Sequence, residues 1–531
     1  MNMKWLKLLT GASLLTGIAA GCGANEEQTV EATTKSSVSP SSEPVQLTYW
    51  LPLPADAARS LKSYGESLLY QEMEKKTGVK VSFQHPATGS EKEQFNLLIA
   101  SGKLPDILET NFVSYPGGPE KAIADKVIIP LNDIIDKHAP NLKKFLDSNP
   151  DIKKDISTDS GVIYAFPGIG VGNTNVSSGL VLRKDWLDEL GLAVPETIDE
   201  WTHVLRQFKE KKNAKTPLTM VMGDFGPDRF NGAYGVGATF YQNGGKVKYG
   251  PYEQAYKDYL AQMNVWFKEG LLDPDFSTQD AKSKDAKVTN GTAGAYAGYI
   301  GGGIGKYLPA VQPANPSFDL VGAQHPVLKK GDEPSIFFAA YSYRGDGSAG
   351  ITTSNKKPEA TAEWLDTFYS EEGNLLKTFG VEGVTYTMVN GQPKYTDLIM
   401  KNPDKLSVGE AMSKYLRVSQ PAPGFVGDDR YFDQYYNYEQ QKQASAVYNK
   451  YYANLVKTRM PQVSQTPEEA QELSSILAEI DTYRSEMFLK FIMGAEPIAN
   501  FDKFCDQLKK MGIERAIELK QAALDRYNNR K

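Results

Sequence analysis

Alternation of short strands with helices restricts the fold of this chain more than any other feature. Residues 45–50 alternate apolar and polar side chains as a β-strand does, and residues 79–83 repeat the pattern. Helical spacing fills the intervals at 61–78 and 91–101, and a third strand is predicted within 102–111. Strands that alternate with helices pair in parallel and form an α/β lobe.

The carboxyl ends of these strands are the predicted binding edge. In open α/β sheets ligands bind just beyond the carboxyl ends of strands. This rule selects Trp50 to Pro52 and Glu109 to Asn111.

The same alternation returns later in the chain. A strand is predicted at 162–167, ahead of the glycine-rich run 168–172, and another at 180–183. A short helix at 184–192 ends on a glycine. The next helix begins at Thr197, with Glu200 placed to complete a capping box. Because 531 residues exceed what one core supports, we expect two lobes.

The amino terminus has the features of a secretory signal peptide over residues 1–21. Lys4 and Lys7 precede a short apolar run that ends in small residues before Cys22. The run is shorter than the roughly 20 residues that span a bilayer. The stretch resembles a bacterial lipobox, in which the cysteine carries diacylglycerol, except that Ala19 stands where leucine is usual. The alternative is a plain secreted protein with one early cysteine.

The remaining composition fits an acidic extracellular body. Residues 23–44 are rich in Ser, Thr, Glu and Pro and predict a disordered tether. Net charge is −6 and becomes more negative once the signal peptide is removed, which disfavours a nucleic-acid partner. No later segment has the apolar length of a membrane helix. With Cys22 lipidated, Cys505 is left unpaired, and its helical context predicts a packing residue.

Patterns typical of enzymes are mostly missing from the sequence. The four histidines lack metal-ligand spacing. The run 345–350 fits Gly-x-Gly-x-x-Gly, but residues 351–353 after it predict a strand, so the dinucleotide interpretation fails. Carboxylates are abundant, so the sequence does not exclude a pair of catalytic carboxylates of the kind that glycosidases use.

Several blocks resemble those of the large lipoproteins of extracellular solute-binding protein family 1, which serve bacterial oligosaccharide ABC importers. The alginate- and pectin-fragment binders are the most similar branch. The blocks follow the family's order and lie at 100–107, 183–187, 195–201, 266–276, 381–387, 466–470 and 525–528.

This resemblance implies a two-lobed α/β, periplasmic-binding-protein-like (class II) fold with a sugar-binding interlobe cleft and hinge crossovers. The segment 351–360 resembles the unit by which the chain returns to the first lobe. The expected divisions are a signal peptide at 1–21, the lipidated cysteine and tether at 22–44, lobe 1 at 45–165 and 345–400, and lobe 2 at 166–344 and 401–531.

Some members of the family carry a calcium loop after the helix that begins near Thr197. Here the corresponding interval, 209–217, offers one Glu, one Asn and four Lys. Calcium needs six to eight oxygen ligands, several of them carboxylates. We therefore expect the site to be lost, with no metal and no cofactor in this chain.

Aromatic residues supply the candidate binding surface, with 29 Tyr, 22 Phe and 6 Trp. Tyr and Trp offer an apolar face and a polar tip, which match the faces and hydroxyl edges of sugars. The predicted ligand-binding residues are Trp50, Asn111, Tyr164, Arg183, Tyr299, Tyr341, Tyr343 and Arg344. The spacing of Tyr431, Tyr435 and Tyr438 places them on one helix face, which favours packing rather than the pocket.

These features predict a non-enzymatic, lipid-anchored receptor on the outer face of the cell membrane. We expect it to be a monomer that captures an oligosaccharide and passes it to the transmembrane subunits of an ABC permease. A surface polysaccharide lyase or glycosidase, and the same fold binding peptides, are the alternatives. Arg183 and Arg344 would suit an acidic sugar, which the acidic net charge does not support.

Overall fold

The computed structural model describes residues 44–171, 175–418 and 422–530. Cys22, the predicted signal peptide and residues 23–43 of the predicted tether lie outside these ranges. Within them, no helix combines the length and the apolar character needed to cross a bilayer.

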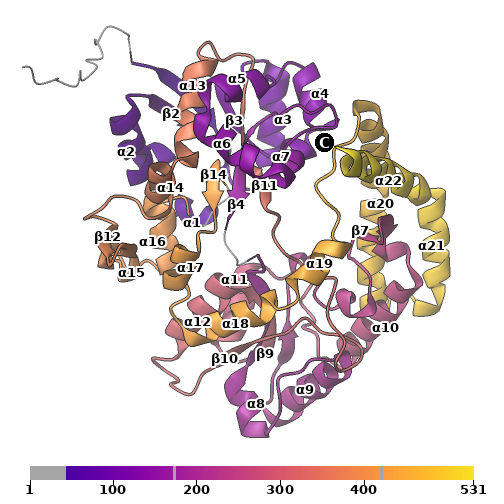
Figure 1. Ribbon diagram of the computed structural model, residues 1–531. Helices are drawn as coiled ribbons and strands as arrows, with labels where there is room; N and C mark the ends of the chain where they lie inside the picture. Colours follow the sequence, from indigo (N-terminus) through magenta and orange to yellow (C-terminus); the bar gives the residue numbers. More distant parts are fainter. Residues whose placement is uncertain (1–43, 172–174, 419–421, 531) are drawn as a thin grey trace, which may run out of the picture. The chain divides into compact units, whose positions relative to one another are not determined.

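A mixed six-stranded sheet organises the first lobe (Figure 1). Its order is β14-β4-β11-β3-β1-β2. The strands are β1 (Gln46–Trp50), β2 (Lys80–Gln84), β3 (Ile107–Glu109), β4 (Phe166–Gly170), β11 (Tyr343–Ile351) and β14 (Gly424–Val426). β1 pairs in parallel with β2 and with β3, which confirms the parallel pairing predicted from the alternation. β11 runs antiparallel to β3 and β4, and β14 runs parallel to β4.

A four-stranded sheet of order β10-β5-β9-β6 organises the second lobe. Its strands are β5 (Ser178–Arg183), β6 (Thr216–Thr219), β9 (Ala293–Tyr299) and β10 (Leu320–Ala323). β5 is antiparallel to β9 and β10, whereas β6 is parallel to β9. Two hairpins lie outside the sheets, β7 (Phe240–Asn243) with β8 (Lys246–Tyr249) and β12 (Tyr386–Val389) with β13 (Gln392–Tyr395).

The α-helices are grouped here by their position in the chain relative to β5 and β11. Those before β5 are α1 (Ala55–Ala58), α2 (Leu68–Thr77), α3 (Glu91–Ser101), α4 (Gly118–Ala124), α5 (Asn132–His138), α6 (Pro140–Ser148) and α7 (Pro150–Asp155). Those between β5 and β11 are α8 (Lys184–Leu190), α9 (Ile198–Lys211), α10 (Gln254–Lys268), α11 (Ala281–Thr289) and α12 (Gly305–Val311). After β11 come α13 (Pro358–Asp366), α14 (Glu371–Thr378), α15 (Asp397–Met400), α16 (Val408–Tyr415), α17 (Asp429–Tyr435), α18 (Glu439–Asn449), α19 (Tyr452–Thr458), α20 (Pro467–Met493), α21 (Phe501–Lys510) and α22 (Ile513–Asn529).

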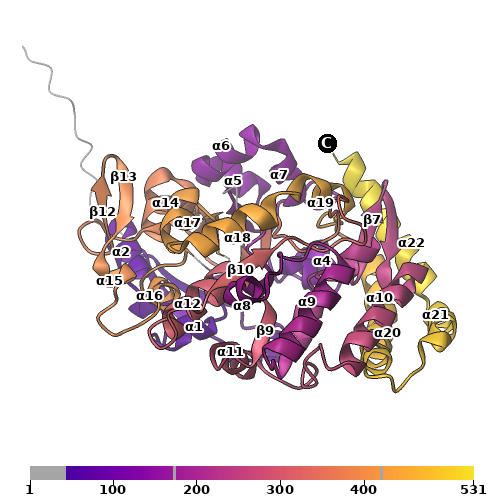
Figure 2. The same cartoon turned by 90° about the horizontal axis from the view of Figure 1, so that it is seen from below.

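Each sheet has its own hydrophobic core, as expected for two lobes. The first core contains Tyr49, Ile107 and Trp364. The second contains Trp201 and Trp266 together with apolar residues of α20, α21 and α22. Figure 2 shows these C-terminal helices along the side of the molecule that carries α10, and α10 packs against α20.

The chain passes between the sheets on the β4–β5, β10–β11 and β14–α18 connections. The last is a crossover because α18 packs on β10 of the second sheet. β4 and β14 therefore belong to the first sheet, although they come from segments 166–344 and 401–531, which were predicted to form lobe 2. The exact residue ranges of the two lobes stay a prediction.

Local signals were confirmed at several helix ends. The Thr197–Glu200 capping box forms at α9, and Gly191 ends α8 in the left-handed conformation.

The strand expected at 162–167 is instead β4, Phe166–Gly170, so part of the glycine-rich run is strand. Its glycines permit close neighbours, since a Cβ on Gly168 would lie 2.8 Å from the Ala422 carbonyl oxygen. The run 345–350 lies within β11, which confirms that it is no dinucleotide loop.

Candidate functional site

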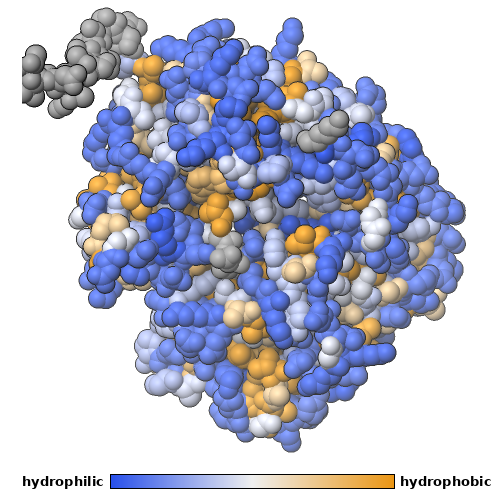
Figure 3. Space-filling view, in the orientation of Figure 1, coloured by the Kyte–Doolittle hydropathy of each residue, from blue (hydrophilic) through white to orange (hydrophobic). Residues whose placement is uncertain are grey.

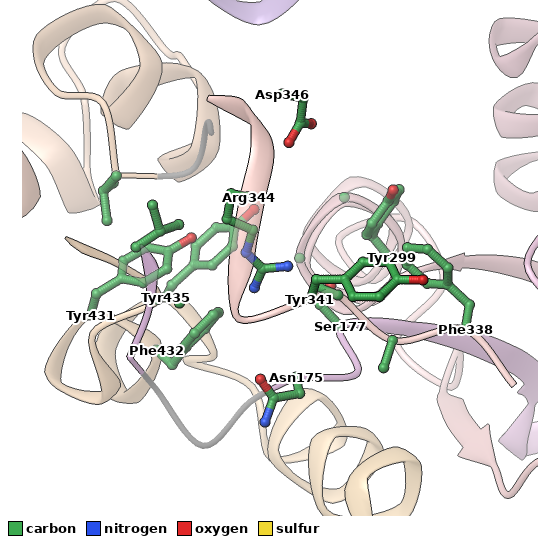
Figure 4. A pocket seen from close by; sticks show the side chains of 18 of the residues that line it. Asn175, Ser177, Tyr299, Phe338, Tyr341, Arg344, Asp346, Tyr431, Phe432 and Tyr435 are labelled. Carbon is green, nitrogen blue, oxygen red and sulfur yellow. The ribbon is translucent and has the colours of Figure 1, made fainter. Parts of the chain in front are cut away.

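A pocket of about 820 Å³ opens between the two sheets. The first sheet contributes residues of β4, β11 and β14, and the second contributes Ser177 and Tyr299 at the ends of β5 and β9. The β4–β5 and β10–β11 connections, together with α1, α16 and α17, supply most of the remaining wall. Figure 4 shows aromatic side chains around this space, with Arg344 between the α17 residues and Tyr341 in that view. The volume lies in the upper part of the range for small-molecule sites.

Five of the predicted ligand-binding residues line this pocket: Asn111, Tyr299, Tyr341, Tyr343 and Arg344. The Tyr299 side chain is 60% exposed and so has a free face. Tyr343 is almost fully buried, and its hydroxyl is 2.8 Å from that of Tyr164. Asn111 accepts a hydrogen bond from the Val113 backbone N–H with its side-chain oxygen, which leaves the amide N–H groups for a ligand. The residues converge because β3 and β9 end, and β11 begins, near the same space.

Three other candidates lie in the cores and do not line the pocket. Trp50 is buried and packs 5.8 Å from the Phe95 ring, centroid to centroid. Tyr164 lies behind Tyr343. Arg183 donates two hydrogen bonds to Asp185, and its guanidinium lies 4.4 Å from the Trp186 ring centroid. Arg183 is therefore already paired within its own lobe.

The expectation that Tyr431, Tyr435 and Tyr438 pack rather than line the pocket was wrong for Tyr431 and Tyr435. Tyr431, Phe432 and Tyr435 of α17 line the pocket, although Tyr431 also belongs to a neighbouring core cluster. Helix α17 ends at Tyr435, so Tyr438 does not continue its face. Helical periodicity shows which side chains share a face but cannot show whether that face meets a core or a pocket, and here it meets both.

Residues just after α19 support the pocket wall and were missed in the sequence. The Arg459 guanidinium lies 4.2 Å from the Tyr341 ring centroid and donates a hydrogen bond to the Ala340 carbonyl. The Tyr341 hydroxyl donates to the Met460 carbonyl at 2.8 Å. Gln462 lines the pocket and donates to the Tyr343 carbonyl. Tyr341 is thus fixed from behind, with its other side toward the pocket.

We expect Arg459→Ala to weaken ligand binding by about 5- to 30-fold, because a desolvated cation–π contact is worth about 1–2 kcal/mol. The loss arises from greater freedom of the Tyr341 ring rather than from a lost ligand contact. Calorimetric titration of both proteins measures it. Arg515→Ala, which removes an exposed arginine of α22, serves as the control. Equal affinity of the Arg459→Ala variant and the parent would contradict the supporting role.

Two predictions concern residues outside the pocket, the interval 209–217 and Cys505. In the described ranges, no group of three His, Cys, Asp or Glu could hold a metal ion. In the interval 209–217, Lys209 donates to the Glu269 carbonyl and Lys212 pairs with Glu189. Absence of calcium there stays a prediction. Cys505 is a half-buried free thiol, and burial raises its pKa to about 12, consistent with packing rather than reactivity.

The face seen in Figure 3 is mostly hydrophilic, with apolar side chains exposed in small clusters.

Comparison with known proteins gives consistent matches over most of the chain. The family described as "Bacterial extracellular solute-binding protein" matches residues 56–375. The fructooligosaccharide ABC transporter substrate-binding protein FusA of Streptococcus pneumoniae is 27% identical and covers 90% of each chain. The polygalacturonan/rhamnogalacturonan-binding protein YtcQ of Bacillus subtilis is 25% identical over 73% of this chain and 75% of its own length.

Solved structures show the same fold. The alginate-binding protein AlgQ2, in a crystal structure without calcium ion, has a TM-score of 0.77 and 26% identity, covering 91% of this chain and 98% of its own. FusA in complex with kestose has a TM-score of 0.74 and 24% identity, covering 92% of this chain and all of its own.

Proposed function

Because this chain belongs to the bacterial extracellular solute-binding proteins, we propose that it captures an oligosaccharide in the pocket between its two sheets and delivers it to an ABC permease. The observation that carries the proposal is the convergence of Tyr299, Tyr341 and Tyr435 from distant parts of the chain on one pocket. Aromatic rings with exposed faces suit the apolar faces of sugars. The names of the similar proteins support the same ligand class, since they refer to fructooligosaccharides, pectic polymers and alginate.

Hinge closure on the ligand is the expected motion. Tyr299 belongs to the second sheet and Arg344 to the first, so a ligand that touches both favours the closed arrangement of the lobes. A permease that recognises the closed form then receives only loaded protein.

The alternatives are a surface polysaccharide lyase or glycosidase, and a receptor for peptides. The matched family and the relatives named above are binding proteins, which favours the receptor. The pocket does contain the carboxylates of Asp56 and Asp346. A direct test therefore has to look for chemistry as well as for binding.

Calorimetric titration with matched panels of oligosaccharides and oligopeptides tests this proposal, together with assays for new reducing ends and unsaturated products. We expect saturable binding of an oligosaccharide with no product formed. Tight binding of peptides alone would overturn the sugar assignment, and glycan cleavage would overturn the receptor.

We propose that Cys22 carries the lipid that attaches the protein to the outer face of the membrane, and that the body is monomeric. Replacing Cys22 with serine is expected to shift most of the protein from the membrane fraction to the medium, because two or more acyl chains anchor stably whereas none leaves a polar tether. Immunoblots of fractionated cells measure this shift. Cys505→Ser, which changes the other cysteine, should stay in the membrane fraction. An unchanged membrane share for Cys22→Ser would contradict lipidation at this residue.

A further inference from the structure

Arg344 is a charged side chain in the pocket wall without a partner. It forms no hydrogen bond or ion pair with any residue that the structure describes. Two other arginines differ in this respect, since Arg459 donates to backbone carbonyls and Arg59 pairs with Glu410. The five N–H donors of the Arg344 guanidinium are therefore available to an occupant of the pocket.

Two glycines of β4 fix the course of this side chain. Arg344 pairs with Gly168 across the β4–β11 ladder. A Cβ added to Gly168 would lie 3.0 Å from the Arg344 Cβ, and one added to Gly170 would lie 3.3 Å from its Nη2 atom. The Arg344 side chain thus lies against bare backbone at both glycines, where a larger residue would crowd it.

The charge of Arg344 is poorly compensated inside the protein. Burial lowers the pKa of its guanidinium, which nevertheless stays charged because the usual value is so high. Asp346 lies in the same pocket and acts in the opposite direction on this pKa. It is exposed, however, and makes no ion pair with Arg344 among the described contacts. A partly desolvated charge without a direct ion-pair partner is unfavourable, so an anionic occupant is favoured.

The geometry of the donor selects the kind of anion. A planar guanidinium matches a carboxylate with two parallel hydrogen bonds, which an isolated hydroxyl cannot reproduce. The aromatic residues on either side, Tyr341 and Tyr435, can contact sugar faces next to that group. Asp346 is placed to accept hydrogen bonds from sugar hydroxyls.

We propose that the ligand is an acidic oligosaccharide built from uronic-acid residues, and that one of its carboxylates binds Arg344. This inference rests on the proposed function, because it specifies the ligand class of the same pocket. It makes Arg344 the residue that distinguishes acidic from neutral glycans.

The test compares oligogalacturonates with their fully methyl-esterified forms and with neutral fructooligosaccharides of equal length, by calorimetric titration of the mature protein. We expect the acid to bind about 10- to 100-fold more tightly than its ester, because the ester loses the charge-assisted hydrogen bonds to Arg344. The preference should fall with added salt. Because the ester changes only the ligand, this comparison needs no variant.

Variants then locate the preference. R344Q is expected to bind acid and ester equally, R344K to keep part of the difference, and R206Q, which removes an exposed arginine paired with Glu269, to match the parent. Thermal melts confirm that each variant is folded. Tighter binding of the ester or of the neutral glycans by the parent would overturn the acidic ligand while leaving the proposed function intact. Binding of none of the glycans, with binding of peptides, would overturn both.

Discussion

Replacing Glu109 with leucine is expected to lower the free energy of unfolding by about 3–5 kcal/mol, because it leaves a buried guanidinium without its counter-charge. Arg417 donates to both carboxylate oxygens of Glu109, at 2.6 and 3.0 Å, and both side chains are almost fully buried. The Tyr49 hydroxyl also donates to Glu109, and Arg417 donates to the Tyr70 hydroxyl at 2.9 Å. The pair joins β3 to the segment that leads from α16 toward β14. Chemical denaturation measures the loss.

The double variant Glu109→Leu/Arg417→Met is the control for this prediction. Removing both charges replaces the ion pair with apolar groups and should recover much of the lost stability, since such replacements are often neutral. A single Glu109→Leu variant that loses less than about 1 kcal/mol would show that the pair is no more important than one on the surface.

Truncating Tyr299 and Tyr341 together to alanine is expected to weaken oligosaccharide binding by about 100- to 1000-fold. Aromatic residues at the centre of a binding site cost about 2 kcal/mol each when truncated, and each 1.4 kcal/mol is a factor of ten in affinity. Tyr299 ends β9 and Tyr341 precedes β11, so the two rings line the pocket from different segments, and the affinity lost with each should be nearly additive. Calorimetric titration with the tightest-binding glycan measures the change.

Phenylalanine at the same two positions provides the matched control. Tyr299→Phe keeps the ring, and Tyr341→Phe removes only the hydrogen bond to the Met460 carbonyl. We expect both to retain most of the affinity. By contrast, Trp50→Ala should reduce stability with little direct effect on ligand contacts, since Trp50 is 6% exposed and packs in the first core. Retained affinity in the double alanine variant would contradict the position assigned to the sugar.

The sequence predicted the elements better than the site. The first three strands, the parallel pairing of β1 with β2 and β3, and the caps of α8 and α9 were predicted, because each depends on neighbours within a few residues. The two-lobed fold followed from the family resemblance. β14, by contrast, is three residues long and reaches its sheet only through contacts with β4, which no local pattern indicates.

Whether a candidate near a strand end lines the pocket depends on its exposure, which is the property that the sequence shows least. Asn111 and Arg344, two of the predicted ligand-binding residues, line the pocket, and their role as ligand contacts stays a proposal. Arg183 is also an arginine near a strand end, but it forms an ion pair with Asp185, two residues later. Arg459 and Gln462 act through contacts with segments more than 100 residues away, which a sequence without an alignment cannot show.

Small-angle X-ray scattering during titration with an acidic oligosaccharide, with product analysis of the same samples, decides whether the two lobes close on a ligand that they leave intact. We expect a radius of gyration that falls to a plateau as the lobes close, with every glycan recovered unchanged. A scattering profile that no glycan alters, together with cleavage of any of them, would contradict it.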